Sequence, residues 1–175
     1  NSKSRNYAHT IRSKSQAILT TGKTILKDNP RFTVRKKSKI IKYLPTIVID
    51  TNLKIPLTSR LLKDINKKRI IIFTSRNNSK SEYLKKIGCE VFTLKKHIDK
   101  QLSLKKIFKK ILELKINDIL VEAGGRFFTN LLKAKLVDEL HLFKSPLLIG
   151  KKGKPVLLQK KIEDIKSKEI LTKKF

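Results

Sequence analysis

The sequence contains no methionine and a single cysteine, Cys89, among its 175 residues. One cysteine excludes an internal disulfide and a cysteine-based zinc site, and it fits a reducing compartment such as the cytoplasm. No run of about 18 apolar residues occurs and no signal-peptide pattern opens the chain, so we expect no membrane span. Translation begins at methionine, so we expect Asn1 to belong to a longer protein.

Aromatic residues are scarce, at 6% of the chain, whereas the formal net charge is +29. Such a charge is typical of nucleic-acid-binding proteins. Here the excess is mostly lysine spread along the whole chain, and isoleucine and asparagine are also abundant, as in proteins from genomes rich in A and T. Few aromatic residues alternate with the basic ones, so the chain lacks the stacking platform of single-strand binders. We therefore expect no nucleic-acid partner.

Apolar runs alternate with segments of helical periodicity along the chain. Short apolar runs bounded by turn residues predict strands at 17–19, 46–50, 69–74, 90–94, 118–122 and 139–143, and a last strand from 168. Helical spacing predicts helices at 4–14, 59–65, 80–87, 102–115 and 126–134, with a short amphipathic turn before Pro30. Residues 36–39 are predicted to form a solvated loop. This alternation favours one α/β domain with a largely parallel sheet covered by helices on both faces.

Polar groups are concentrated in the stretch AILTTGKTILKDNPRFTVR, residues 17–35. A buried strand end leads into small hydroxylated residues and Gly22, which allow a sharp exit from the strand. Pro30 ends the following turn because its ring excludes Asn29 from the helical region. Hydroxyl groups, the carboxylate of Asp28 and the guanidinium of Arg35 therefore cluster near one strand end, where sites of α/β sheets are often built.

A second candidate is the segment VEAGGR, residues 121–126, which reads as a strand end, a glycine turn and a helix start. Free amides at a helix N-terminus favour a phosphate, and glycines let a ligand approach the backbone. A tight turn that needs glycine for conformational reasons alone explains the pattern equally well. Glu122 is more informative, because a carboxylate at the end of a buried strand costs free energy unless a partner pairs with it.

Together these segments resemble the reductase domain of the bifunctional riboflavin-biosynthesis deaminase/reductase. The resemblance rests on AILTTGKTILKDNPRFTVR, on Arg12 upstream, and on DILVEAGG and LVDELHLFKSPLLIG downstream, in the same order as in that family. It covers nearly the whole chain. It implies a dihydrofolate-reductase-like three-layer fold, and it implies reduction of 5-amino-6-(5-phosphoribosylamino)uracil to the ribitylamino product with NADPH.

The resemblance also implies site residues. Arg12 and Arg35 would hold the substrate phosphate, Phe32 would contact the substrate, and Glu122 would bind the pyrimidine. The cofactor contacts would be Thr24, Asp28, Thr51, Gly124, Gly125, Arg126, Phe127, Phe128, Thr129 and Asn130. From its position after a strand and its charge we expect Arg76 to contact the 2′-phosphate of NADPH. No metal site is expected.

In that reaction the substrate's ribosylamine opens to an imine, and the cofactor delivers hydride to the former C1. Asp28 is the expected catalytic residue, because a carboxylate can stabilise a cationic imine or relay a proton. The family further implies a homodimer and a zinc deaminase domain that is fused or adjacent. The deaminase signature H-x-E with P-C-x-x-C is absent from these 175 residues.

The expected domain is residues 1–175, an incomplete reductase domain. The family has a first strand inside the sheet, ahead of the helix at 4–14, and we expect it and part of the last strand to be missing. An open sheet edge would follow, with poor solubility or no activity of the isolated piece. Three alternatives remain: another reductase of the same fold class, a basic nucleic-acid-binding module, and a catalytically silent scaffold.

Overall fold

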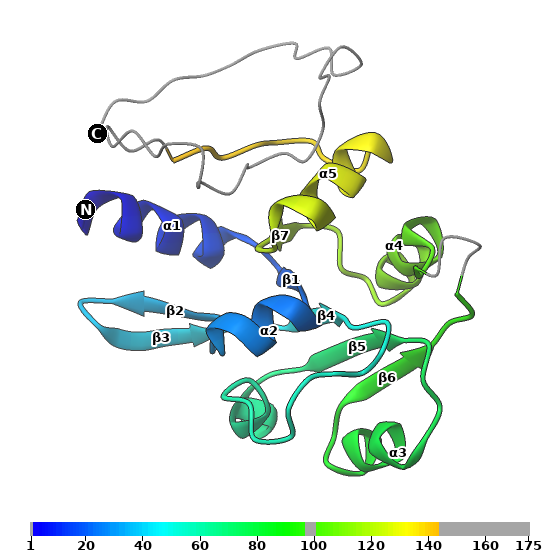
Figure 1. Cartoon of the computed structure of the whole chain (residues 1–175). Helices are drawn as coiled ribbons and strands as arrows, with labels where there is room; N and C mark the ends of the chain where they lie inside the picture. The colour runs from blue at the N-terminus through cyan, green and yellow to red at the C-terminus, as the bar shows by residue number, and fades with distance from the viewer. Residues whose placement is uncertain (1, 97–100, 144–175) are drawn as a thin grey trace.

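The computed structural model describes residues 2–96 and 101–143 (Figure 1). Five parallel strands form its main sheet, in the order β6-β5-β4-β1-β7. They are β1 (Ala17–Thr21), β4 (Thr46–Ile49), β5 (Ile70–Thr74), β6 (Glu90–Thr93) and β7 (Ile119–Val121). The largely parallel sheet predicted from the alternating pattern is confirmed.

The central strands form because their sequences are nearly continuous β-branched and apolar runs, as expected for a sheet covered on both faces. Every residue of β4 and β5 is buried. In-register pairing places Leu19 of β1 beside Ile47 of β4 and Val121 of β7. Successive residues then point to opposite faces, so β1, β4, β5 and β6 contribute to two separate cores, and β7 contributes to one of them.

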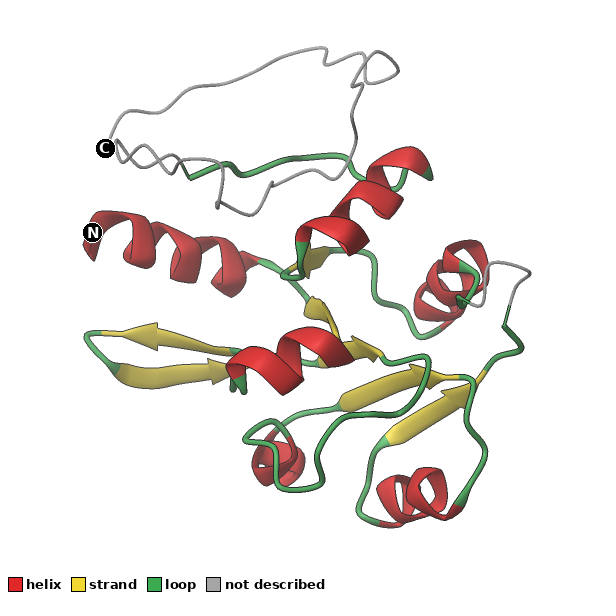
Figure 2. Ribbon diagram, in the orientation of Figure 1, coloured by secondary structure: helices red, strands yellow, loops and turns green. Residues whose placement is uncertain are grey.

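The two cores lie on opposite faces of the sheet and give the fold its three layers (Figure 2). One core receives Ile25 from α2 (Gly22–Asp28), Leu62 from the 3₁₀ helix η1 (Leu62–Lys67) and Leu84 from α3 (Ser79–Lys86). The other receives Ile107 and Ile111 from α4 (Leu104–Glu113) and Phe127 from α5 (Gly125–Lys133). Helices therefore cover both faces, as predicted.

Helix α1 (Ser2–Lys14) has no fully buried residue and lies beside a small hairpin rather than over the main sheet (Figure 1). The hairpin pairs β2 (Thr33–Lys36) with β3 (Lys39–Tyr43). The prediction of a solvated loop at 36–39 is confirmed in part: all four residues are exposed and Lys37 and Ser38 form a turn, but Lys36 and Lys39 pair with each other as strand ends. Both turn residues have positive φ, 46° and 64°, as a two-residue hairpin turn with this twist requires.

The strand predicted at 139–143 is not formed: these residues have no regular secondary structure and take part in no ladder of the described sheets. A strand needs a neighbour for its backbone groups, and in the described part of the chain β7 is the edge of the sheet and pairs only with β1. The predicted strand from 168, like the PLLIG run at 146–150, lies outside the described residues.

No helix among the described residues has the length and apolar character needed to span a bilayer.

Candidate active site

The carboxyl ends of the parallel strands meet at one edge of the sheet and bring the predicted polar residues to it. Following the strand order, this edge carries Arg76 after β5, Thr51 after β4, Thr24 after β1 and Gly124 after β7. These four positions are spread from residue 24 to residue 124 in the sequence, and they meet at one edge because the crossovers return every strand in the same direction. The fold thus collects the predicted cofactor contacts along one line.

Thr21 and Gly22 form the exit from β1. The Thr21 side chain caps α2 by accepting a hydrogen bond from the Thr24 amide at 3.3 Å, and the two threonine hydroxyls lie 3.1 Å apart. Gly22 packs against the buried carboxylate of Asp50, so that a Cβ there would stand 2.5 Å from Asp50 Oδ2. The same oxygen accepts the Ile55 amide at 2.7 Å, which fixes the loop after β4.

Glu122 follows β7 and is paired, as its position required. Arg12 donates to it twice, from Nε to Oε1 at 2.5 Å and from Nη2 to Oε2 at 2.7 Å. Arg12 Nη1 also donates to the backbone oxygen of Thr33 at 3.0 Å. The two residues assigned to opposite ends of the substrate therefore contact each other, and Arg12 is not the free surface arginine that its helix position alone suggests.

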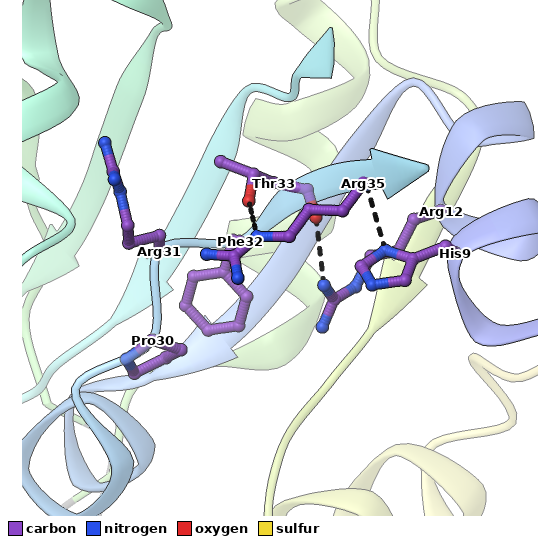
Figure 3. Close-up of a pocket in the computed structure, with 7 residues that line it drawn as sticks. All are labelled: His9, Arg12, Pro30, Arg31, Phe32, Thr33 and Arg35. Carbon is purple, nitrogen blue, oxygen red and sulfur yellow. Dashed lines mark hydrogen bonds between the residues drawn. The ribbon is translucent and has the colours of Figure 1, made fainter. Parts of the chain in front are cut away.

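A pocket of about 160 Å³ lies between α1 and the start of β2 (Figure 3). Cationic and polar side chains line it together with two apolar ones: His9, Arg12, Arg31, Thr33 and Arg35, with Pro30 and Phe32. Arg35 Nε donates to Thr33 Oγ1 at 3.3 Å, which holds the guanidinium over the strand. Three of the four predicted substrate contacts, Arg12, Phe32 and Arg35, are thus brought together, and the fourth is the partner of Arg12.

The loop between α2 and β2 is anchored by side chains of η1 and of the residue that follows it. Arg31 makes a two-fold ion pair with buried Asp64 of η1, with Nε–Oδ2 at 2.9 Å and Nη2–Oδ1 at 2.5 Å. The Arg31 guanidinium keeps the pKa of Asp64 below its usual value. Lys68 is buried beside it, and its Nζ donates to the Arg31 oxygen at 2.5 Å and to Thr46 Oγ1 at 3.2 Å. Burial lowers the pKa of Lys68 to about 8. These contacts flank Phe32, which has a positive φ of 52°.

The N-terminus of α5 is open. Gly124 is its N-cap residue and no side chain caps the helix, and a Cβ at Gly124 would meet nothing within 4 Å. Beyond the first turn the segment is occupied by the fold itself. Phe127 packs in the core, and the Thr129 hydroxyl donates to the Gly125 oxygen at 2.7 Å. Among residues 124–130, it is the first turn that offers groups to a ligand.

Asp28 is the last residue of α2 and is exposed, and no ion pair to it occurs among the described residues. It does not line the pocket of His9 and Arg35. The next residue, Asn29, adopts a left-handed conformation with φ of 41°, so the helix ends before Pro30, as predicted. Asp28 is therefore an available carboxylate beside, but not within, the arginine pocket.

Sequence reasoning missed several residues of this region. His9 is not among the predicted site residues, yet it lines the pocket. Asp64 and Lys68 support the loop from an element more than 30 residues away, with separations of 33 and 37 residues to Arg31. Only the spacing of His9 and Arg12, one turn apart on a single helix face, was visible in the sequence.

Comparison with known proteins is consistent with this geometry. The family model described as the RibD C-terminal domain matches residues 1–173. The riboflavin biosynthesis protein RibD of Aquifex aeolicus is 35% identical over 153 residues, which are 84% of this chain and 39% of that protein. A protein of Buchnera aphidicola from Acyrthosiphon pisum, named 5-amino-6-(5-phosphoribosylamino)uracil reductase, is 26% identical over 85% of this chain and 74% of its own length.

Among solved structures, RibD of Acinetobacter baumannii superposes with a TM-score of 0.75 at 20% identity, over 90% of this chain and 42% of that one. This likeness supports the dihydrofolate-reductase-like fold. The chain spans about two fifths of the length of the RibD relatives that it matches, 39% and 43% in two of them. On the match over residues 1–173, the chain belongs to the RibD C-terminal reductase domain family.

Proposed function

We propose that this chain is the reductase unit of a riboflavin-biosynthesis protein, and that it reduces the ribosyl group of 5-amino-6-(5-phosphoribosylamino)uracil with NADPH. One observation carries the proposal: Arg12 lines the cationic pocket and at the same time holds Glu122. A ligand with a phosphate at one end and a ring bearing N–H groups at the other fits such a pair of subsites. The named function of the relatives supports this substrate class.

In this proposal Arg35 and Arg12 bind the phosphate, for which a guanidinium fork is well suited. Glu122 accepts hydrogen bonds from ring N–H or amino groups of the pyrimidine. Because Glu122 is held by Arg12 at 2.5 and 2.7 Å, its oxygens are oriented before the substrate arrives. Phe32 closes one side of the pocket with an apolar surface.

The residues at the sheet edge fit a nicotinamide dinucleotide. The open first turn of α5, at Gly124, Gly125 and Arg126, has space and amide donors for a phosphate. Thr24 and Thr51 lie further along the same edge of the sheet, after β1 and β4. Arg76 follows β5, farther from β7, where it would contact the 2′-phosphate of NADPH. When bound, NADPH supplies a hydride. The chain's part is to orient the substrate, and Asp28 is proposed to hold or transfer the proton at the reacting nitrogen.

We also propose that residues 1–175 are an incomplete reductase domain, completed by an extended segment of the longer protein beside β7. The supporting feature is a groove of about 780 Å³ bounded by α1, the strand edge at β7 and residues 136–143. Tyr7, Leu140, Leu142 and Phe143 give it apolar walls. The family resemblance further supports a homodimer and a fused or adjacent zinc deaminase.

The test is a reductase assay on the intact protein. We expect the intact protein to oxidise NADPH in the presence of 5-amino-6-(5-phosphoribosylamino)uracil, as monitored by the absorbance of NADPH. Oxidation of NADH with the same substrate should be slower. Preference for the diaminopyrimidinone analogue that has not been deaminated would assign the chain to a reductase acting earlier. Absence of NADPH binding by the intact protein would refute the proposal and favour a scaffold role.

A further inference from the structure

His9 occupies a defined place in the arginine pocket. It projects from α1 on the same face as Arg12, and both side chains reach β2, where Thr33 and Arg35 stand (Figure 3). The backbone N–H of Arg35 donates to His9 Nδ1 at 3.2 Å. A ring that accepts at Nδ1 carries its proton on Nε2 when neutral, so the ring is both oriented and left with a donor on its other nitrogen.

The surroundings of this imidazole are strongly positive. The charged groups around it are Arg12 on its own helix, Arg35 on β2, Arg31 on the loop before β2 and Glu122 after β7. Arg31 is neutralised by Asp64 and Arg12 by Glu122. Arg35 makes no ion pair among the described residues and its Nε donates only to Thr33 Oγ1, so the pocket retains positive charge that attracts an anion.

We propose that His9 is a third ligand of the substrate phosphate, beside Arg12 and Arg35, and that it takes up a proton from solvent when the phosphate binds. The proposal deepens the proposed function, and it rests on that function for the identity of the anion. The added proton goes to Nδ1, the nitrogen that accepts the Arg35 N–H in the free pocket, so this hydrogen bond breaks when the ring is protonated. Nε2–H then donates a charge-assisted hydrogen bond to a phosphate oxygen, and the released Arg35 N–H becomes a further donor for the anion. The site would then recognise the phosphate by its charge, and its affinity would depend on the protonation state of His9.

The direction of the effect follows from the charges. In the ligand-free pocket, burial and then the charges of Arg12 and Arg35 lower the pKa of His9, while Glu122 opposes them. A bound dianion offsets the two arginines and favours the imidazolium, so the pKa of His9 rises on binding. Anion affinity should therefore be highest when His9 is protonated and fall as pH rises through the pKa of the complex.

The probe is inorganic sulfate, which stays doubly charged from about pH 5.5 to about pH 8.5, so that any pH dependence comes from the protein. Calorimetry of the intact protein in buffers of different ionisation enthalpy measures the protons taken up per sulfate. We expect uptake near neutral pH, with affinity falling roughly tenfold across this range. Ribose 5-phosphate then tests whether a phosphate ester binds the same site.

The variant His9→Asn keeps an acceptor for the Arg35 N–H and removes the titrating ring. It should bind sulfate roughly tenfold more weakly at low pH, with no proton uptake, and match the unmodified protein at high pH. His141→Asn is the matched control, because His141 lines the other groove and should leave both quantities unchanged. Protection of the Arg35 amide in His9→Asn would show that the hydrogen-bonded arrangement survives.

Should His9→Asn fail to fold, the imidazole signals of the unmodified protein decide the matter. Saturating sulfate should raise the pKa of His9 and leave the chemical shifts of the His141 ring unchanged; an unchanged His9 pKa overturns the proposal. A protein that lacks reductase activity yet shows sulfate-linked proton uptake would refute the proposed function alone. A fully active enzyme in which His9→Asn leaves the pH dependence of substrate KM unchanged would refute the role of His9 alone.

Discussion

Arg12 and Glu122 share two hydrogen bonds of 2.5 and 2.7 Å although 110 residues separate them in the chain. The pair ties α1 to the turn after β7, and its side chains are only 22% and 27% exposed. Arg69 and Glu90 form a similar two-fold pair within the same sheet, at 2.8 and 3.0 Å, but with 46% and 35% exposure. The two ion pairs therefore allow a half-buried pair to be compared with a more exposed one in the same protein.

We predict a larger coupling energy for the half-buried pair. In a double-mutant cycle with Arg12→Met and Glu122→Met, the coupling in the free energy of unfolding should be about 1–2 kcal/mol, because these charges are less screened by water. The matched cycle at Arg69 and Glu90 should give less than about 0.5 kcal/mol. Urea denaturation of the intact protein measures both. Equal couplings would mean that burial of the Arg12–Glu122 pair has no energetic effect.

Gly22→Ala should destabilise the fold. The added methyl would stand 2.5 Å from Asp50 Oδ2 and 2.9 Å from Asp50 Cβ, and Asp50 cannot retreat without losing its hydrogen bond to the Ile55 amide. Overpacking of this kind costs about 1–3 kcal/mol. Gly124→Ala is the control, because a Cβ there meets nothing within 4 Å; it should cost less than about 1 kcal/mol, the loss of a favourable N-cap residue.

Because Lys68 is buried, we predict that the free energy of unfolding rises at alkaline pH. Burial lowers its pKa from 10.5 to about 8 in the folded chain, so between these values the unfolded chain binds more protons. Stability relative to the variant Lys68→Met should therefore increase as pH rises from about 8 towards 10.5, by roughly 3 kcal/mol at most. Thermal denaturation of both proteins across this range gives the difference. A constant difference would show that Lys68 titrates normally.

The main sheet could be predicted because its strands carry a strong local signal. Runs such as TIVID and RIIIFT are apolar on both faces, and turn residues bound them, so their existence did not depend on distant contacts. The hairpin gave no such signal. Its turn is Lys37-Ser38, without the Asn-Gly or Gly that usually marks positive φ, and the exposed strand β3 has lysines at both Lys39 and Lys42.

The strand predicted at 139–143 shows the limit of local reasoning, because LHLF is a good strand sequence that has no paired neighbour in the described part of the chain. The site was predictable to a similar degree. The need for a partner at Glu122 followed from burial cost, but the sequence could not say that Arg12 would be that partner. His9 and Lys68 were missed because their importance arises from contacts with the loop around Phe32.

Asp28→Asn in the intact enzyme should reduce kcat roughly a hundredfold and change NADPH affinity less than about twofold. The amide keeps the size of the side chain but cannot hold or transfer a proton at neutral pH. Asp28 is exposed at the end of α2, so the folded structure should be unaffected. Glu82→Gln, an exposed carboxylate on α3 that pairs with Lys85, is the control. Unchanged turnover in Asp28→Asn would remove Asp28 from the chemistry.

The last prediction concerns the open side of β7. Asp118 and Glu122 direct their backbone groups to β1, at 3.2 Å to the Ala17 amide and 2.9 Å to the Leu19 oxygen. Alternation then directs the amides of Ile119 and Val121 to the groove. If an extended segment of the longer protein occupies that groove, these two amides should exchange rapidly in the isolated 175-residue chain and slowly in the intact protein.

Amides of the central strand β4 provide the reference for this exchange experiment, because both of its neighbours are present and its residues are buried. They should be protected in both forms, which separates local opening at the edge from global instability. The isolated chain should also bind a hydrophobic dye through the walls formed by Leu140, Leu142 and Phe143, whose exposed fractions are 53%, 53% and 46%. Slow exchange of Ile119 and Val121 in the isolated chain, without dye binding, would show that the reductase unit is closed within residues 1–175.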